Sequence, residues 1–168
     1  MLWQLARFFA ILPYWFKYYV VETLMFVLLC YCLRYRRSVV NRNLRNSFPE
    51  KSERERAVLR RKFYWTLSEL FIDTVDLAHM TPAKGRRILR VKGLEEHLSK
   101  VEGRDWIAMT AHFGCWEYCS FWSIYAPSQI VVAVYHPLES RLADAFYRRL
   151  RNGEYATPVP MRESLRFY

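Results

Sequence analysis

The stretch MTAHFGCWEY, residues 109–118, places a histidine after an apolar run and a glutamate five residues later. Five residues of α-helix turn through about 500°, so His112 and Glu117 would not share one face of a helix. The spacing instead predicts that His112 follows a buried strand over 105–111 and that Glu117 lies in the first turn of the next helix. Gly114 would give the turn between them its conformational freedom.

Such a pair has a chemical use. A carboxylate in a first helical turn can accept a hydrogen bond from one ring nitrogen of His112, and the other nitrogen can then take a proton from a substrate hydroxyl. A buried histidine that is salt-bridged to Glu117 fits the same spacing, although a place at the carboxyl end of a strand favours catalysis. His112, Cys115 and Cys119 match no common zinc pattern, and no third group accompanies a Cys115 nucleophile, so we expect no metal and no cofactor.

Strand-like and helix-like patterns alternate on both sides of this stretch. The predicted strands cover 88–93, 105–111, 129–137 and 155–160, and the predicted helices cover 94–100, 118–126, 139–153 (with Gly153 as its stop) and the segment from 161 onward. This alternation predicts an α/β fold with a partial mixed sheet and crossover helices. Upstream, residues 48–80 have helical spacing and are predicted to form one long helix, and Ser52 with Glu55 is a capping-box signature at its start.

The first 33 residues are mostly large and apolar, interrupted by Arg7, Lys17 and Glu22. A cluster of arginines without acidic residues follows, at positions 34, 36, 37, 42 and 45. A basic cluster after an apolar helix is typical of a cytoplasmic flank on an anionic leaflet. We therefore predict a membrane-associated helix with a basic flank over 1–46, followed by a catalytic domain over 47–168. Short-span and monotopic insertion both remain open, and a buried core helix with a basic solvated face fits the same pattern.

The 168-residue chain carries a formal net charge of +10, which favours anionic partners. Nucleic acid is not expected among them, because the polybasic stretch adjoins an apolar helix and is not interleaved with exposed aromatic residues. The four cysteines show no disulfide framework, which indicates a reducing compartment.

Three blocks in order, VVNRNLRNSFPEKSERER, AHFGCWE and YHPLESRLADAFYRRLRNG, resemble the bacterial lipid A biosynthesis acyltransferases, the late lauroyl/myristoyl transferases. These enzymes belong with the wider glycerolipid acyltransferases that share the H-x4-D/E motif. The resemblance covers nearly the whole chain. It implies that His112 is the general base, that Glu117 orients it, and that Arg149 and Arg151 face a phosphate-bearing substrate or carrier. Alternatively, Arg149 and Arg151 lie on a solvent-exposed helix face.

The resemblance also implies the partners: an acyl-acyl carrier protein as donor, a glycolipid hydroxyl as acceptor, and the cytoplasmic face of the bacterial inner membrane as location. A lysophospholipid or other lipid acyltransferase could use the same two residues. The chain departs from the family at Cys115, where asparagine is usual. It also stops at Tyr168, inside a predicted helix, whereas the family continues, so a truncated and inactive family member is a further alternative.

Overall fold

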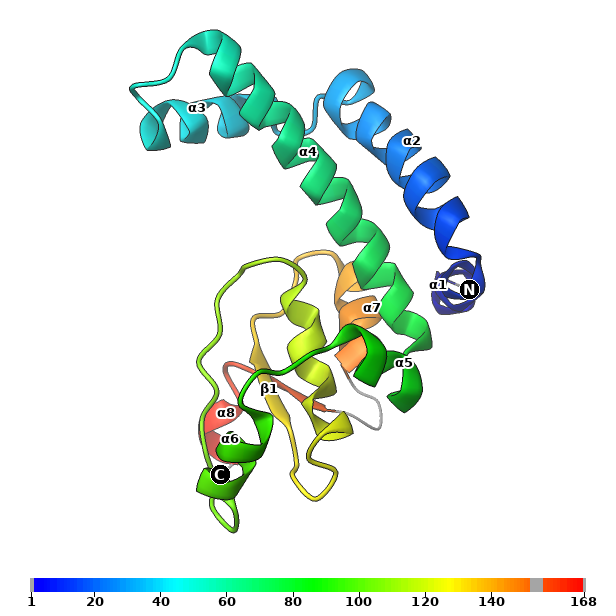
Figure 1. Ribbon diagram of the computed structural model, residues 1–168, viewed down its shortest axis with the longest axis vertical. Coiled ribbons are helices and arrows are strands. Elements are labelled where there is room, and N and C mark those ends of the chain that lie inside the picture. Colours follow the sequence, from blue (N-terminus) through cyan, green and yellow to red (C-terminus); the bar gives the residue numbers. More distant parts are fainter. Residues whose placement is uncertain (1, 152–155, 168) are drawn as a thin grey trace. The chain divides into compact units, whose positions relative to one another are not determined.

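The computed structural model describes residues 2–151 and 156–167 (Figure 1). The chain divides into two compact units, Phe8–Asp76 on the one hand and Met1–Arg7 with Leu77–Tyr168 on the other. Helix α1 (Leu2–Ile11) contributes residues to both units. The predicted division into a membrane-associated segment over 1–46 and a catalytic domain over 47–168 stays a prediction.

The Phe8–Asp76 unit is helical. After α1 the chain contains η1 (Phe16–Val21), α2 (Glu22–Val27), η2 (Leu28–Cys32), α3 (Arg37–Ser47) and the long α4 (Glu53–Asp76). Figure 1 shows α2 lying alongside α4. The core of this unit includes Leu29, Cys30, Val40 and the fully buried Tyr64. The Tyr64 hydroxyl donates to the carbonyl of Tyr35 at 2.8 Å, which ties α4 to the loop before α3.

The predicted long helix and its capping box are confirmed. The backbone N–H of Ser52 donates to the Glu55 carboxylate at 2.8 Å, and the backbone N–H of Glu55 donates back to the Ser52 hydroxyl at 3.3 Å. These bonds satisfy two of the donors that a helix start leaves without partners. The hydrogen bonds from Ser52 also lower the pKa of Glu55.

Two of the charges that interrupt the apolar N-terminal run, Lys17 and Glu22, lie against α4. Buried Lys17 forms an ion pair with buried Asp76 and donates to the Ala10 carbonyl at 3.1 Å. The Tyr18 hydroxyl donates to Asp73 at 2.6 Å. Glu22 is also buried, and its pKa is raised first by burial and then by the nearby carboxylates. These polar residues therefore pack inside the helical unit, while aromatic residues of the same run, such as Tyr19 at 71% exposure, face outward.

By length and composition, no single helix in the described part of the chain could cross a membrane. Helix α1 and the helical stretch Phe16–Cys32 pass the same test only as a pair that is bent at the break between them.

The second unit carries the sheet. It contains η3 (Leu77–His79), α5 (Pro82–Ile88), α6 (Leu94–Val101), η4 (Trp116–Ile124), β1 (Val132–Tyr135), α7 (Arg141–Arg151), β2 (Thr157–Pro160) and α8 (Ser164–Phe167). Strands β1 and β2 pair in parallel, with Val132 opposite Thr157 and Tyr135 opposite Pro160, and α7 connects them. The described residues thus confirm a small α/β arrangement, but their sheet is parallel and not mixed.

The order of the strands and helices is predicted better than their number. The structure confirms strands within 129–137 and 155–160 and helices that overlap 94–100, 118–126 and 139–153. The second of these helices has 3₁₀ geometry and begins two residues earlier than predicted, at Trp116. The predicted strands over 88–93 and 105–111 are wrong: neither segment joins the sheet, and Ile107 and Met109 are 91% and 96% exposed. An apolar run becomes a strand only when a neighbouring strand satisfies its backbone groups. The predicted helix stop at Gly153 lies outside the described residues.

Prolines shape the outer edge of β2. The N–H groups of Thr157 and Met161 donate towards β1, to the carbonyls of Val131 and Tyr135, both at 2.8 Å. Along a strand, the backbone N–H groups of alternate residues point to opposite sides, so positions 158 and 160 face away from β1. Both positions are prolines, which have no N–H to donate. The free side of β2 therefore offers a further strand no N–H donors at these two positions, as is typical of an edge strand.

Gly85 marks a close contact between α5 and η4. A Cβ atom at this buried position would overlap Cδ1 of buried Ile124. We expect Gly85→Ala to lower the free energy of unfolding by about 1 kcal/mol in urea titrations, because the end of the buried Ile124 side chain must move to make room for the added methyl group. Valine lacks Cδ1, so Ile124→Val in the same chain should recover part of this loss. The same change in stability for Gly85→Ala in the wild-type and in the Ile124→Val protein would contradict the contact.

Candidate active site

His112 lies in the exposed loop that precedes η4, and Glu117 is the second residue of η4. Gly114 between them has φ +59°, a left-handed conformation that favours glycine. The predicted turn between the two residues and the place of Glu117 in the first helical turn are confirmed. The strand that was expected to end before His112 is absent, since 105–111 has no strand partner among the described residues.

The loop around His112 is apolar and exposed. Ile107, Met109 and Phe113 are each at least 90% exposed. The His112 imidazole is itself exposed and lies against the Trp116 ring, with the ring centroids 4.5 Å apart. The imidazole therefore stands at the surface where a substrate can reach it, and the first residue of η4 supports it from one side.

Glu117 is buried, with 4% of its surface exposed. Arg151, the last residue of α7, donates two hydrogen bonds to its carboxylate: Nε to Oε2 at 2.9 Å and Nη2 to Oε1 at 2.5 Å. Bidentate arginine–carboxylate pairs are among the strongest polar contacts in proteins. This pair fixes the start of η4 to the end of α7.

Two aromatic rings enclose the Arg151 guanidinium. It lies 5.5 Å from the ring centroid of Tyr135 on β1 and 5.4 Å from that of Tyr147 on α7. Burial alone would lower the pKa of Arg151, but the hydrogen bonds and the charge of Glu117 raise it above its ordinary value. Burial, and then the charge of Glu117, also raises the pKa of the Cys119 thiol, which disfavours a thiolate here.

The four predicted site residues are thus only partly brought together. The structure joins Glu117 to Arg151; among the described residues no hydrogen bond connects His112 to Glu117, and the ring contact of His112 is with Trp116. The roles of His112 and Glu117 in catalysis stay predictions. Their arrangement, an exposed imidazole five residues before a firmly held carboxylate, is compatible with them.

Arg149 lies two residues before Arg151, and two residues of α-helix turn through about 200°. The side chains therefore leave α7 on opposite sides. Arg149 is exposed, and its guanidinium lies 5.0 Å from the ring centroid of Trp3, which also packs near Phe146. Of the two arginines, Arg149 is the one whose charge faces outward.

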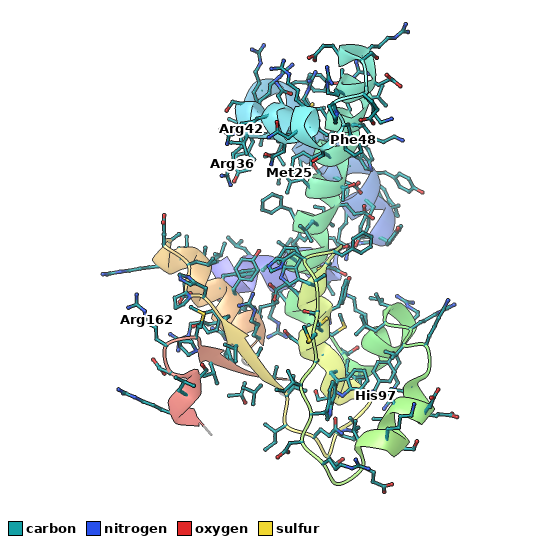
Figure 2. All side chains as sticks on the ribbon, turned by 90° about the vertical axis from the view of Figure 1, so that its left-hand side faces the viewer. Met25, Arg36, Arg42, Phe48, His97 and Arg162 are labelled. Atoms are coloured by element: carbon teal, nitrogen blue, oxygen red, sulfur yellow. The ribbon has the colours of Figure 1, made fainter. Side chains whose placement is uncertain are left out.

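An aromatic cluster, Trp106, Trp122 and His97, holds the base of the His112 loop. The two indole N–H groups both donate to Oε1 of Gln129, at 3.3 Å from Trp106 and 3.1 Å from Trp122. The His97 ring packs edge-on against both indoles, at 4.6 Å and 5.5 Å between centroids. His97 lies on α6 and is labelled in Figure 2. The cluster anchors Trp106, immediately before the exposed stretch that leads to His112.

Sequence reasoning missed the pairing of Arg151 with Glu117 and the ring contacts of Tyr135. One signal was available: a buried carboxylate needs a cation, and the arginine-rich end of the 139–153 helix supplies candidates. The open groove lined by Thr157–Pro160, Glu163 and Arg166 contains none of the four predicted site residues. The residues that the structure describes include no group of three or more His, Cys, Asp and Glu side chains able to hold a metal ion.

Comparison with known proteins agrees with the resemblance. The sequence model of one family, bacterial lipid A biosynthesis acyltransferase, matches residues 3–166. No curated protein and no solved structure matches the chain. The family match extends over both compact units and includes His112, Glu117, Arg149 and Arg151. The chain therefore belongs to the bacterial lipid A biosynthesis acyltransferase family, whose members transfer acyl groups to lipid substrates.

Proposed function

We propose that this protein transfers a fatty acyl chain from acyl-acyl carrier protein to a hydroxyl of a lipid A precursor, with His112 as general base. The observation that carries the proposal is the exposed His112 imidazole, five residues and one glycine turn before the buried carboxylate of Glu117, which Arg151 holds in place. A general base must be accessible to the substrate, while the group that orients it is best held rigidly.

In the proposed reaction, one ring nitrogen of His112 takes the proton of the acceptor hydroxyl as its oxygen attacks the thioester carbonyl. The tetrahedral intermediate collapses, the carbon–sulfur bond breaks, and the carrier thiolate takes the proton from the imidazolium. In the described part of the chain no hydrogen bond joins His112 to Glu117, so the proposed mechanism requires the His112 ring to turn from Trp116 towards Glu117. The Glu117 carboxylate then accepts a hydrogen bond from the other ring nitrogen and stabilises the imidazolium. The products are an ester and a free carrier thiol.

Arg149 is proposed as the contact for an anionic group of the acceptor or the carrier. Its exposed guanidinium in the last turn of α7 supports this role. Arginine suits phosphate because its planar N–H donors match the phosphate oxygens. The net charge of +10 supports an acidic carrier protein as donor, since complementary charge speeds association.

Lipid A analysis of a deletion strain tests the proposed function. We expect mass spectrometry to show lipid A with one acyl chain fewer, restored when the gene is returned on a plasmid. A lysophospholipid acceptor is the second candidate, because the same two residues suit any lipid hydroxyl. Unchanged lipid A together with accumulated lysophospholipid would replace the first candidate with the second.

We further propose that the protein works at the cytoplasmic face of the bacterial inner membrane. Exposed aromatic residues of the N-terminal run, such as Trp15 and Tyr19, support contact with the headgroup region. Arginines 34, 36, 42 and 45 are exposed around the start and along the length of α3. Figure 2 shows Arg36 and Arg42 at the α3 end of the helical unit. Together these residues suit an anionic lipid surface.

Vesicle binding checks this proposal. Each arginine near an anionic leaflet contributes about 1 kcal/mol, so Arg36→Gln with Arg42→Gln should weaken binding to phosphatidylglycerol vesicles about 30-fold at low salt. The matched control, Arg36→Lys with Arg42→Lys, keeps both charges and should bind almost as well as wild type. Equal binding of all three proteins in co-sedimentation assays would show that these arginines do not face the membrane.

A further inference from the structure

The ion pair between Arg151 and Glu117 involves the carboxylate that is proposed to orient His112. The side chains of Glu117 and Arg151 are 5% and 17% exposed, so the pair is largely withdrawn from water. A carboxylate buried to this degree needs a partner charge, and both of its oxygens accept from Arg151. The position of the Glu117 carboxylate therefore depends on Arg151.

Glu117 retains capacity for a second partner. Each carboxylate oxygen has two lone pairs, and each accepts one hydrogen bond from Arg151. The carboxylate can therefore accept a hydrogen bond from the His112 imidazole while Arg151 stays in place. A chain of three groups, guanidinium to carboxylate to imidazole, is chemically consistent.

The Arg151 guanidinium is also held from several sides. Tyr135 approaches it from β1 and Tyr147 from its own helix. Two tyrosine rings and two directed hydrogen bonds leave the guanidinium little freedom to turn towards a substrate. This geometry differs from that of Arg149, which is exposed.

We propose that Arg151 is a positioning residue of the acyltransferase site: it holds the Glu117 carboxylate in place for His112 and does not bind the substrate phosphate. This inference rests on the proposed function of His112 and Glu117. It gives the two arginines of α7 separate tasks, Arg151 inside the site and Arg149 at the surface.

Steady-state kinetics separate positioning from substrate binding. We expect Arg151→Gln to lower kcat about 10–100-fold while KM changes less than about twofold, as when a group that orients a catalytic residue is lost. Arg151→Lys should recover part of kcat. Because Arg151 acts through Glu117, the double variant Glu117→Gln/Arg151→Gln should be no slower than Glu117→Gln alone. A raised KM at unchanged kcat, or additive losses in the double variant, would overturn the inference.

A spectroscopic readout tests the same contact without relying on activity. In protein labelled with ¹³C at the glutamate carboxyl carbon, the Glu117 resonance is assigned by its loss in Glu117→Gln. The Glu117 resonance should shift in Arg151→Gln and also in Arg151→Lys. The lysine variant keeps the charge and replaces the glutamine variant in the test if the latter does not fold. The resonance should stay unchanged in the control Arg148→Gln, an exposed arginine of the same helix. An unshifted resonance in both Arg151 variants overturns the inference. If the wild-type protein transfers no acyl group, the proposed function is refuted. The Glu117 carboxyl resonance then still shows whether Arg151 contacts Glu117.

Discussion

A His112→Gln variant is expected to lose about 10²–10⁴-fold in kcat for acyl transfer, the usual contribution of a positioned general base. Glutamine cannot take the hydroxyl proton at neutral pH, so the acceptor oxygen must attack without deprotonation. The imidazole is exposed, and its ring contact is with Trp116, so the substitution should leave the free energy of unfolding within about 0.5 kcal/mol of wild type. Initial rates with saturating donor and acceptor measure the effect.

His136 provides the matched control. It is also exposed, and its Nδ1 lies 2.9 Å from the neighbouring Pro137 carbonyl. His136→Gln therefore repeats the chemical change at a surface histidine to which no catalytic role is assigned, and it should keep the wild-type kcat. A His112→Gln enzyme with the activity of His136→Gln would remove His112 from the mechanism.

The second large effect is on stability. Asp76→Leu is expected to lower the free energy of unfolding by about 3–5 kcal/mol, because it leaves the buried Lys17 ammonium without its ion-pair partner. The lysine cannot easily reach water, since it lies between the N-terminal helical run and α4 and donates to the Ala10 carbonyl. Chemical denaturation followed by circular dichroism measures the loss.

Two further variants show whether the charge is the cause. Lys17→Met together with Asp76→Leu removes both charges and should return most of the stability. Asp73→Asn should cost little, because burial raises the pKa of Asp73 and its hydrogen-bonded Tyr18 hydroxyl can donate to an amide oxygen as well. A double variant as unstable as Asp76→Leu would mean that the ion pair is not what is lost.

The sequence was most informative where one local interaction decides the structure. The capping box of Ser52 and Glu55 needs no distant partner, and neither does the glycine turn at Gly114, so both were predictable. The amphipathic spacing of α7 was likewise sufficient for its helix, whose Leu150 is buried.

Long-range partners were not predictable in the same way. The apolar run over 105–111 has the composition of a buried strand, yet a strand also requires a neighbour at its edge, which spacing along the chain does not reveal. Lys17 and Glu22 were recognised as interruptions of an apolar helix, but their burial against α4 depends on a helix about fifty residues away. For the same reason Arg151 was identified as a basic site residue while its contact with Glu117, 34 residues away, was not.

The decisive measurement of the proposed function is acyl transfer by the purified protein. The protein is incubated in mixed micelles with acyl-acyl carrier protein and a lipid A precursor. The masses of the lipids and of the carrier are then measured by mass spectrometry. We expect a precursor heavier by one ester-linked acyl chain, formed in equal amount with free carrier thiol. Consumption of the thioester to free fatty acid, with the precursor unchanged in mass, would contradict it.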